Sequence, residues 1–223
     1  MGSFNLFDRI KDLPGDTIET FKSLHSNPIV GFVVLSLLIV LILIVKSRKI
    51  RFTHRLIAHM SMFIALAVVL NLIIIYKLPQ GGSVTLASMV PLVILSYMYG
   101  TGVGMVSGFI FGIIDMMLGG YILTPMQVLL DYPLAFMLIG LSGLFRDKLM
   151  ISFVIAFFAR FISHFLSAII FFREYAPEGM MPELYGIIYN GSFLAVELLI
   201  TIVVLKFLPL DRIVKRSNID NES

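Results

Sequence analysis

Long apolar runs separated by short polar segments dominate the chain, and their lengths predict membrane-spanning helices. The first apolar run extends from Ile29 to Val45. Six more runs follow, over 56–76, 83–98, 101–118, 123–145, 149–172 and 183–208. Each is close to the roughly 20 residues that a helix needs to cross a bilayer. The pattern predicts an all-α integral membrane protein, in which a six-helix bundle over 56–208 follows one extra transmembrane helix.

Composition supports the same class. Apolar residues make up 58% of the 223 positions and charged residues only 14%. A soluble domain is nearer half apolar and a quarter charged, so part of this apolar surplus must face lipid. The chain has no cysteine, which excludes disulfides and thiolate metal sites.

The positions of the charges predict how the helices are oriented. Residues 1–27 form a polar segment of mixed charge, and 28–55 combines the extra helix with a strongly basic loop. The cations of that loop are Lys46, Arg48, Lys49, Arg51 and Arg55. Because basic loops stay in the cytoplasm, this loop and the basic tail 209–223 are expected inside. The C-terminus is then cytoplasmic and the N-terminus extracellular.

Four glycines at a spacing of four residues mark the third helix of the bundle: Gly100, Gly104, Gly108 and Gly112. They form one face almost without side chains, against which another helix can pack very closely. We expect this face to pack inside the monomer rather than to form an oligomer interface.

Polar groups inside the apolar runs are the strongest functional signal, since a charge in mid-bilayer costs roughly 2.5–3.5 kcal/mol on insertion scales. Arg160 and Glu197 are expected to pair with each other to close the bundle. Asp131, His164 and Asn190 instead fall in the outer halves of their helices, among aromatic residues. A carboxylate, an imidazole and an amide within aromatic surroundings suggest a site for a small cationic heteroaromatic ligand. Aromatic residues near a membrane boundary are also typical of the interfacial belt, and composition leaves both interpretations open.

Two prolines flank the carboxylate at position 131. Pro125 suits the first turn of a helix. Pro133 lacks a backbone N–H and is expected to kink the helix beside Asp131. Irregular backbone at membrane depth is tolerated where it is buried or lines a cavity.

A set of spaced motifs carries a resemblance to a known family. They are Tyr99 to Gly104, Tyr121 to Leu123, Gln127 to Tyr132, His164-Phe165, Ile169 to Phe172, Tyr175-Ala176, Gly179, Tyr185 and Asn190-Gly191. With these motifs, residues 56–208 resemble the thiamine-specific S component, the substrate-binding subunit, of the energy-coupling factor family of vitamin transporters.

The resemblance implies capture of extracellular thiamine at the plasma membrane of a bacterium, without catalysis and without a cofactor or metal. Matching positions assign the substrate-binding role to Asp131, His164, Asn190, Tyr185, Tyr132, Tyr121 and Phe172. The implied partners are a transmembrane coupling protein and two ATPase subunits, with Ser61 and Ala65 as candidate docking residues on the first helix of the bundle. No phosphate-binding Gly-rich loop occurs in the chain, so ATP hydrolysis is assigned to the partners. No nucleic acid is implied.

The chain departs from the family's pattern at three places. Asp131 stands where the pattern has glutamate, and Phe172 stands where it has tryptophan. The pattern also has a tryptophan near Gly82, whereas this chain contains none. The carboxylate is one methylene shorter here, and phenylalanine is a weaker cation–π partner than tryptophan.

Two alternative functions remain open at this point. The first is an S component for another vitamin or for its pyrimidine precursor. The second is a rhomboid-type intramembrane serine protease, because Gly140-Leu141-Ser142-Gly143 has the G-x-S-G pattern and His164 is a candidate base. Ser142 is expected near the cytoplasmic end of its helix and His164 in the outer half of the next one. That separation argues against the protease.

Overall fold

A computed structural model describes residues 50–145 and 148–210, together with the isolated positions 35, 39, 42, 43 and 46. The predicted polar segment 1–27, most of the predicted anchor and basic loop 28–55, and nearly all of the tail 209–223 lie outside the described residues. The boundaries of those segments stay predictions. The bundle predicted over 56–208 is described almost completely.

The described chain is mainly helical. Its helices are α3 (His54–Leu72), α4 (Met89–Tyr99), α5 (Thr101–Met117), α6 (Pro125–Leu129), α7 (Ala135–Ile139), α8 (Leu149–Phe171) and α9 (Pro182–Phe207). Short helical turns are η1 (Pro79–Gly81), η2 (Leu130–Leu134), η3 (Gly140–Gly143) and η5 (Arg173–Tyr175). Two strands, β1 (Ile74–Lys77) and β2 (Ser83–Thr85), form an antiparallel hairpin.

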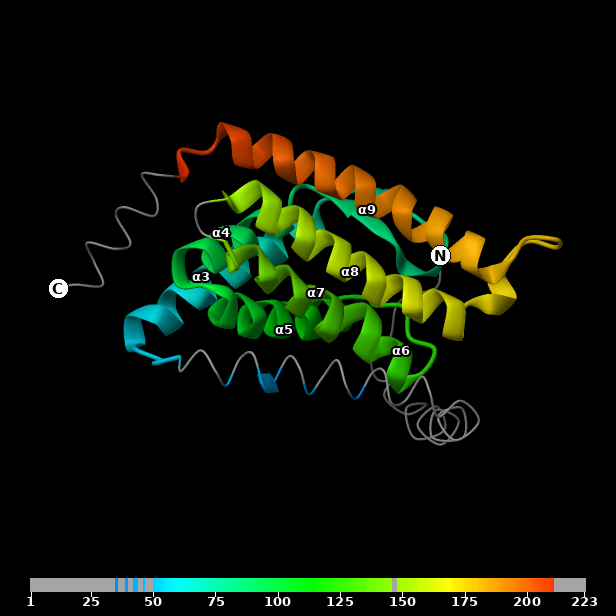
Figure 1. Ribbon diagram of the computed structural model, residues 1–223, viewed down its shortest axis with the longest axis horizontal. Coiled ribbons are helices and arrows are strands. Elements are labelled where there is room, and N and C mark those ends of the chain that lie inside the picture. The colour runs from blue at the N-terminus through cyan, green and yellow to red at the C-terminus, as the bar shows by residue number, and fades with distance from the viewer. Residues whose placement is uncertain are drawn as a thin grey trace.

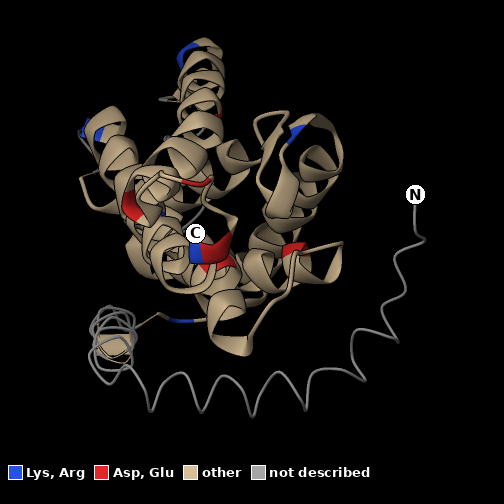
Figure 2. Cartoon of the chain, turned by 90° about the vertical axis from the view of Figure 1, so that its right-hand side faces the viewer, with Lys and Arg blue, Asp and Glu red and all other residues tan. Residues whose placement is uncertain are grey.

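The helices lie side by side along the long axis of the molecule (Figure 1). The start of α3 and the end of α9 lie at one end of the bundle, and the β1–β2 hairpin runs behind α9 toward the other end. The connection from α8 to α9 also lies at this second end, which we call the hairpin end. Figure 2, which looks at this end, shows how sparsely charged residues occur along the described helices.

Length and composition identify four stretches of the described chain that can cross a membrane: 54–72, 125–143, 149–171 and 182–207. The helices α4 and α5 are apolar but shorter, with 11 and 17 residues. At 1.5 Å per residue, α4 extends only about 16 Å, roughly half the thickness of the hydrocarbon core. The fold class predicted from the apolar runs is confirmed.

The β1–β2 hairpin corrects two predicted helix boundaries. The predicted span 56–76 is wrong over 73–76, because α3 ends at Leu72 and β1 follows. The predicted span 83–98 is wrong over 83–88, which hold β2 and a short connection to α4. The run Ile73 to Ile75 is β-branched, and such short apolar runs suit a strand as well as a helix. A turn with Gln80 (φ 56°) and Gly81 (φ 96°) reverses the chain between the strands.

One turn of π-helix interrupts the stretch 125–143 beside the carboxylate, where the prolines predicted a kink. Thr124 caps α6 by accepting a hydrogen bond from the Gln127 amide (3.2 Å), and Pro125 follows in the first turn. Pro133 then lies inside η2, which is one turn of π-helix. Proline cannot donate the usual α-helical hydrogen bond, and a π turn accommodates the resulting gap in the ladder. This wider turn contains Asp131.

The glycine face of α5 packs inside the monomer, as expected. A Cβ atom added at Gly104 would lie 2.9 Å from the Cα of Gly140. One added at Gly112 would lie 2.9 Å from the Cα of Pro133, and one at Gly108 would collide with the carbonyl of Phe136. The helix α5 therefore lies in direct backbone contact with the stretch 125–143, and this contact supports the turn that holds Asp131.

Candidate functional site

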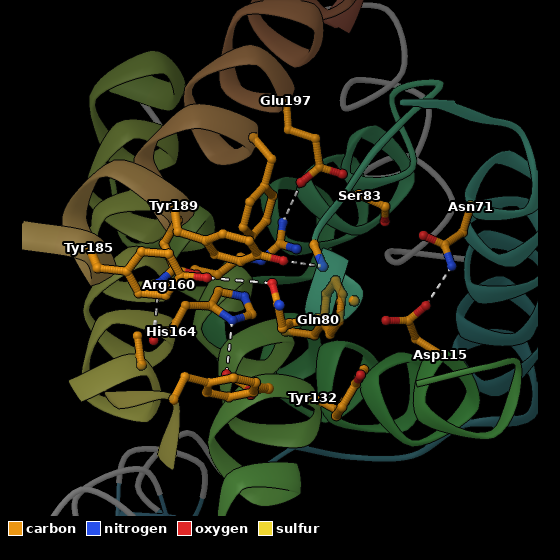
Figure 3. Close-up of a pocket in the computed structure, with 18 residues that line it drawn as sticks. Asn71, Gln80, Ser83, Asp115, Tyr132, Arg160, His164, Tyr185, Tyr189 and Glu197 are labelled. Atoms are coloured by element: carbon orange, nitrogen blue, oxygen red, sulfur yellow. Dashed lines mark hydrogen bonds and ion pairs between the residues drawn. The ribbon is translucent and has the colours of Figure 1, made fainter. Parts of the chain in front are cut away.

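The polar groups predicted from the sequence meet at a cavity of about 690 Å³, including its opening, near the hairpin end. Its lining combines residues of α3, the hairpin, α5, the stretch 125–143, α8 and α9. Figure 3 shows the labelled side chains converging from these elements on one space.

Asp131 is the most heavily hydrogen-bonded group of the cavity. Its Oδ2 accepts from Gln127 Nε2 (2.6 Å) and from Ser167 Oγ (2.9 Å). Its Oδ1 lies 3.2 Å from His164 Nδ1. The π turn directs the carboxylate toward α8, where His164 and Ser167 are three residues apart and share a face. Asp131 and His164, predicted as members of one site, are therefore in direct contact.

His164 keeps one ring nitrogen without a partner. Its Nε2 is buried and makes no hydrogen bond within the described part of the chain. Its ring meets Phe193 edge to face, with 5.9 Å between centroids. A neutral imidazole has one donor and one acceptor nitrogen, so Nε2 is available to a ligand as either, depending on the tautomer.

Phe172 and Tyr132 form part of the aromatic lining near Asp131. Phe172 lines the cavity and is 8% exposed, and its ring centroid lies 6.0 Å from that of Tyr121 and 5.7 Å from that of Tyr175. Tyr132 also lines the cavity, and its hydroxyl donates to the Tyr121 carbonyl (3.2 Å). Tyr121 itself is not among the lining residues. It contacts Phe172 and Tyr132 and so supports the aromatic lining from outside the cavity.

The N-terminal half of α9 joins the cavity to the hairpin. Tyr189 Oη donates to the Pro79 carbonyl and accepts from the Gly82 amide (3.1 Å). Tyr185 Oη lies 3.4 Å from Gln80 Oε1 (Figure 3). These bonds hold the hairpin turn over α9, so that the turn forms one wall of the cavity.

Asn190, predicted as a site residue, also lines the cavity, but its amide is directed at backbone. Its Nδ2 donates to the Gly186 carbonyl (2.9 Å) and lies 3.4 Å from the His164 carbonyl. The side chain is 5% exposed. Asn190 thus ties α9 to α8 next to His164.

Two further polar pairs belong to the lining of the cavity. Arg160 Nη1 donates to Glu197 Oε2 (2.8 Å), which confirms the pair expected from the sequence. Thr85 Oγ1 donates to Glu197 Oε1 (2.9 Å) and so links β2 to this pair. Asn71 Nδ2 donates to Asp115 Oδ1 (2.6 Å), on the opposite side of the cavity from His164 in Figure 3.

Several site residues were missed from the sequence. Gln127 and Ser167 could have been predicted, because each lies about one helical turn from a predicted site residue and therefore on the same helix face. Tyr189 lies one turn after Tyr185 in the same way. Gln80 had no comparable signal, because a hairpin that folds over distant helices leaves no local periodicity.

The three other residues singled out from the sequence lie outside the cavity. Ser61 and Ala65 are exposed on α3, on a different face from its buried Met60 and Ile64. Ser142 is buried in η3, and its hydroxyl has no hydrogen-bond partner within the described residues. It is absent from the lining of the cavity that contains His164.

The fold and the cavity define a class: a multi-pass helical membrane protein with a small-molecule site among its helices. Residues 57–216 match the family described as thiamine transporter protein (Thia_YuaJ). The thiamine transporter ThiT of Bacillus subtilis is 31% identical over 166 residues, which cover 66% of this chain and 86% of that protein. The thiamine transporter ThiT of Lacticaseibacillus paracasei is 32% identical over 136 residues, which cover 52% and 68%.

A solved structure of ThiT from Listeria monocytogenes aligns with a TM-score of 0.62 and 24% identity, over 70% of this chain and 93% of that one. At this identity the likeness concerns the fold. Together with the family match, the chain belongs to the thiamine transporter protein family. It is a membrane transport protein and not an enzyme, so the alternative of an intramembrane protease is wrong.

Proposed function

We propose that this chain captures thiamine in the cavity at the hairpin end and acts as the substrate-binding subunit of an energy-coupling factor transporter. The single observation that carries the proposal is the placement of the Asp131 carboxylate. It lies in a cavity with His164 and the aromatic rings of Phe172, Tyr132, Tyr185 and Tyr189. Thiamine joins a permanently cationic thiazolium to an aminopyrimidine, and the lining offers complementary groups to both parts.

Each group has a role that its contacts support. The carboxylate of Asp131 balances the thiazolium charge and accepts from the aminopyrimidine. The aromatic rings stack against the heterocycles, and a cation over such a face gains about 0.5–2 kcal/mol. His164 offers its free Nε2, and Asn190 holds the backbone beside it. Tyr121 supports Phe172 and Tyr132 and is a positioning residue.

The positive-inside rule supports the orientation of this site. The basic loop precedes α3 and the basic tail follows α9 in the sequence, and the start of α3 and the end of α9 lie at the end of the bundle opposite the hairpin. The hairpin end then faces the outside, and the cavity opens toward extracellular thiamine. The C-terminus is cytoplasmic, and the extra helix places the N-terminus outside.

In the proposed transporter, ATP hydrolysis is assigned to partner subunits, because this chain contains no phosphate-binding Gly-rich loop. The proposed partners are a transmembrane coupling protein and two ATPase subunits. Ser61 and Ala65 are small, exposed and four residues apart on α3, which suits close approach of a helix of the coupling protein.

A binding titration tests the proposal. Purified full-length protein in detergent is titrated calorimetrically with thiamine and, separately, with a panel of other vitamins and with the free aminopyrimidine. Saturable binding of thiamine, much tighter than that of the rest of the panel, is expected. Tighter binding of another vitamin would instead assign the chain to that ligand.

A further inference from the structure

Tyr175 lies outside the lining of the cavity but contacts two residues that shape it. Its hydroxyl oxygen lies 2.8 Å from that of Tyr121, and either oxygen can be the donor. Its ring centroid lies 5.7 Å from that of Phe172, which lines the cavity. Neither tyrosine is a lining residue. Any effect of Tyr175 on a ligand in the cavity must therefore pass through the residues that it contacts.

The backbone places Tyr175 beside Phe172. Phe172 is the C-cap of α8, and the short turn η5 follows it. Within this turn the Tyr175 amide donates to the Phe172 carbonyl (3.0 Å), which folds the chain back toward the end of α8. Because no further helical turn follows Phe172, its ring packs instead between two tyrosines. The centroid of Tyr121 lies 6.0 Å from it on one side of this contact, and that of Tyr175 completes the group.

Tyr121 connects Tyr175 to the carboxylate of the site. The Tyr121 carbonyl accepts from Tyr132 Oη (3.2 Å) and from Gln127 Nε2 (3.1 Å). The same Nε2 donates to Asp131 Oδ2 (2.6 Å). A continuous path of hydrogen bonds therefore leads from the backbone of Tyr121 to the carboxylate that we propose as the partner of the thiazolium.

Tyr121 also contacts the hairpin turn. A Cβ atom added at Gly81 would lie 2.8 Å from the Cβ of Tyr121. Gly81 belongs to the turn that forms one wall of the cavity. The hairpin turn, the connection 118–124 and the turn η5 therefore meet at Tyr121, and the hydroxyl bond to Tyr175 ties η5 to this meeting point.

We propose that Tyr175 is a positioning residue of the thiamine site. Its ring holds Phe172 and its hydroxyl holds Tyr121, so that the stacking ring and the carboxylate are ordered before the ligand arrives. A site that is already ordered loses less free energy to ordering when a ligand binds, and Tyr175 raises the affinity in this way without touching the ligand. The inference rests on the proposed function, because it takes thiamine as the ligand.

Calorimetric titration of the full-length protein with thiamine tests the role of the hydroxyl bond. The samples are wild type, Tyr175→Phe, Tyr121→Phe and the double variant, in which each phenylalanine removes one hydroxyl and keeps the ring. Loss of this one bond predicts an affinity reduced about threefold to tenfold in Tyr175→Phe. Because both hydroxyls belong to the same bond, the double variant should lose no more than Tyr121→Phe alone. Tyr76→Phe, at an exposed tyrosine of β1 outside the cavity lining, is the control and should bind like wild type.

The chain has no tryptophan, which allows a direct measurement on the Phe172 ring. Phe172→Trp introduces a single indole next to Tyr175, and its fluorescence is the only tryptophan signal of the protein. In this background, Tyr175→Phe should make the indole more accessible to quenching by acrylamide, because the neighbouring ring loses its fixed position. Tyr76→Phe in the same background should leave the quenching unchanged.

The outcomes separate this role from a general contribution to stability. Thermal unfolding of the same samples should show melting temperatures close to wild type, since the lost bond is exposed. Wild-type affinity in Tyr175→Phe, losses that add in the double variant, or unchanged quenching overturns the role of Tyr175. A melting temperature that falls in step with the affinity also overturns it. These results leave the proposed function intact, whereas failure of the wild-type protein to bind thiamine overturns the proposed function itself.

Discussion

Replacing Asp131 with asparagine removes one charge from the cavity with little change of shape. The amide carbonyl can take the place of Oδ2 and still accept from Gln127 and Ser167, which lie 2.6 and 2.9 Å away. The amide nitrogen then faces His164 Nδ1, which accepts a hydrogen bond when the imidazole is neutral and carries its proton on Nε2. We therefore expect the free energy of unfolding to change by less than about 1 kcal/mol.

The expected loss of thiamine affinity is much larger. At about 5 Å and an effective dielectric constant of about 20, a carboxylate and a thiazolium attract each other by roughly 3 kcal/mol. A hydrogen bond to a charged group contributes about 1.5–3 kcal/mol. These terms overlap, and together they predict an affinity reduced roughly tenfold to hundredfold or more.

Calorimetric titration of wild type, Asp131→Asn and His164→Ala with thiamine measures this loss, and thermal unfolding of the same samples monitors the fold. His164→Ala is expected to weaken binding less, because a neutral imidazole contributes one ordinary hydrogen bond and a ring face. Glu178→Gln is the control for the change of charge, because Glu178 lies on the exposed loop between α8 and α9. Wild-type affinity in Asp131→Asn would refute the assignment of the site even if thiamine remained the ligand.

Three further predictions follow from packing, ring chemistry and charge. Phe172→Trp should tighten thiamine binding by about twofold to fivefold, because tryptophan is the better cation–π partner, and a titration that shows weaker binding would contradict its stacking role. Gly108→Ala should lower the melting temperature, because the added Cβ collides with the Phe136 carbonyl. Gly191→Ala is the control and should leave the melting temperature unchanged, because its added Cβ meets no atom within 4 Å beyond the neighbouring residues of its own helix. In this cysteine-free chain, a cysteine introduced at Glu178 should react with an impermeant maleimide added to intact cells. A label that enters only after permeabilisation would reverse the proposed orientation.

Much of the architecture could be predicted from the order of residues. The apolar runs determined the membrane class, because a chain of this size and composition has more apolar residues than a globular core can bury, and the surplus must face lipid. The glycine spacing determined a face for close packing, and Pro133 determined a break in the helix that holds Asp131. Helical periodicity is local, so these features need no knowledge of distant parts of the chain.

The pairing of charged groups could also be predicted in part. A charge in mid-bilayer needs a partner, and this requirement predicted the pair of Arg160 and Glu197 from the sequence alone. The same cost singled out Asp131 and His164, although their contact of 3.2 Å depends on how α8 packs against the π turn. The sequence named these groups because their burial is costly. It did not give the distances between them.

Only the tertiary structure decided that a β-hairpin forms and that Asn71 is bonded to Asp115. The run Ile73 to Ile75 suits a strand and a helix equally, and its choice depends on the antiparallel partner strand Ser83–Thr85. Asn71 and Asp115 are 44 positions apart, and neither carries a motif that indicates the other. Their bond forms because α3 and α5 pack together, and long-range packing of this kind leaves no periodic trace in the sequence.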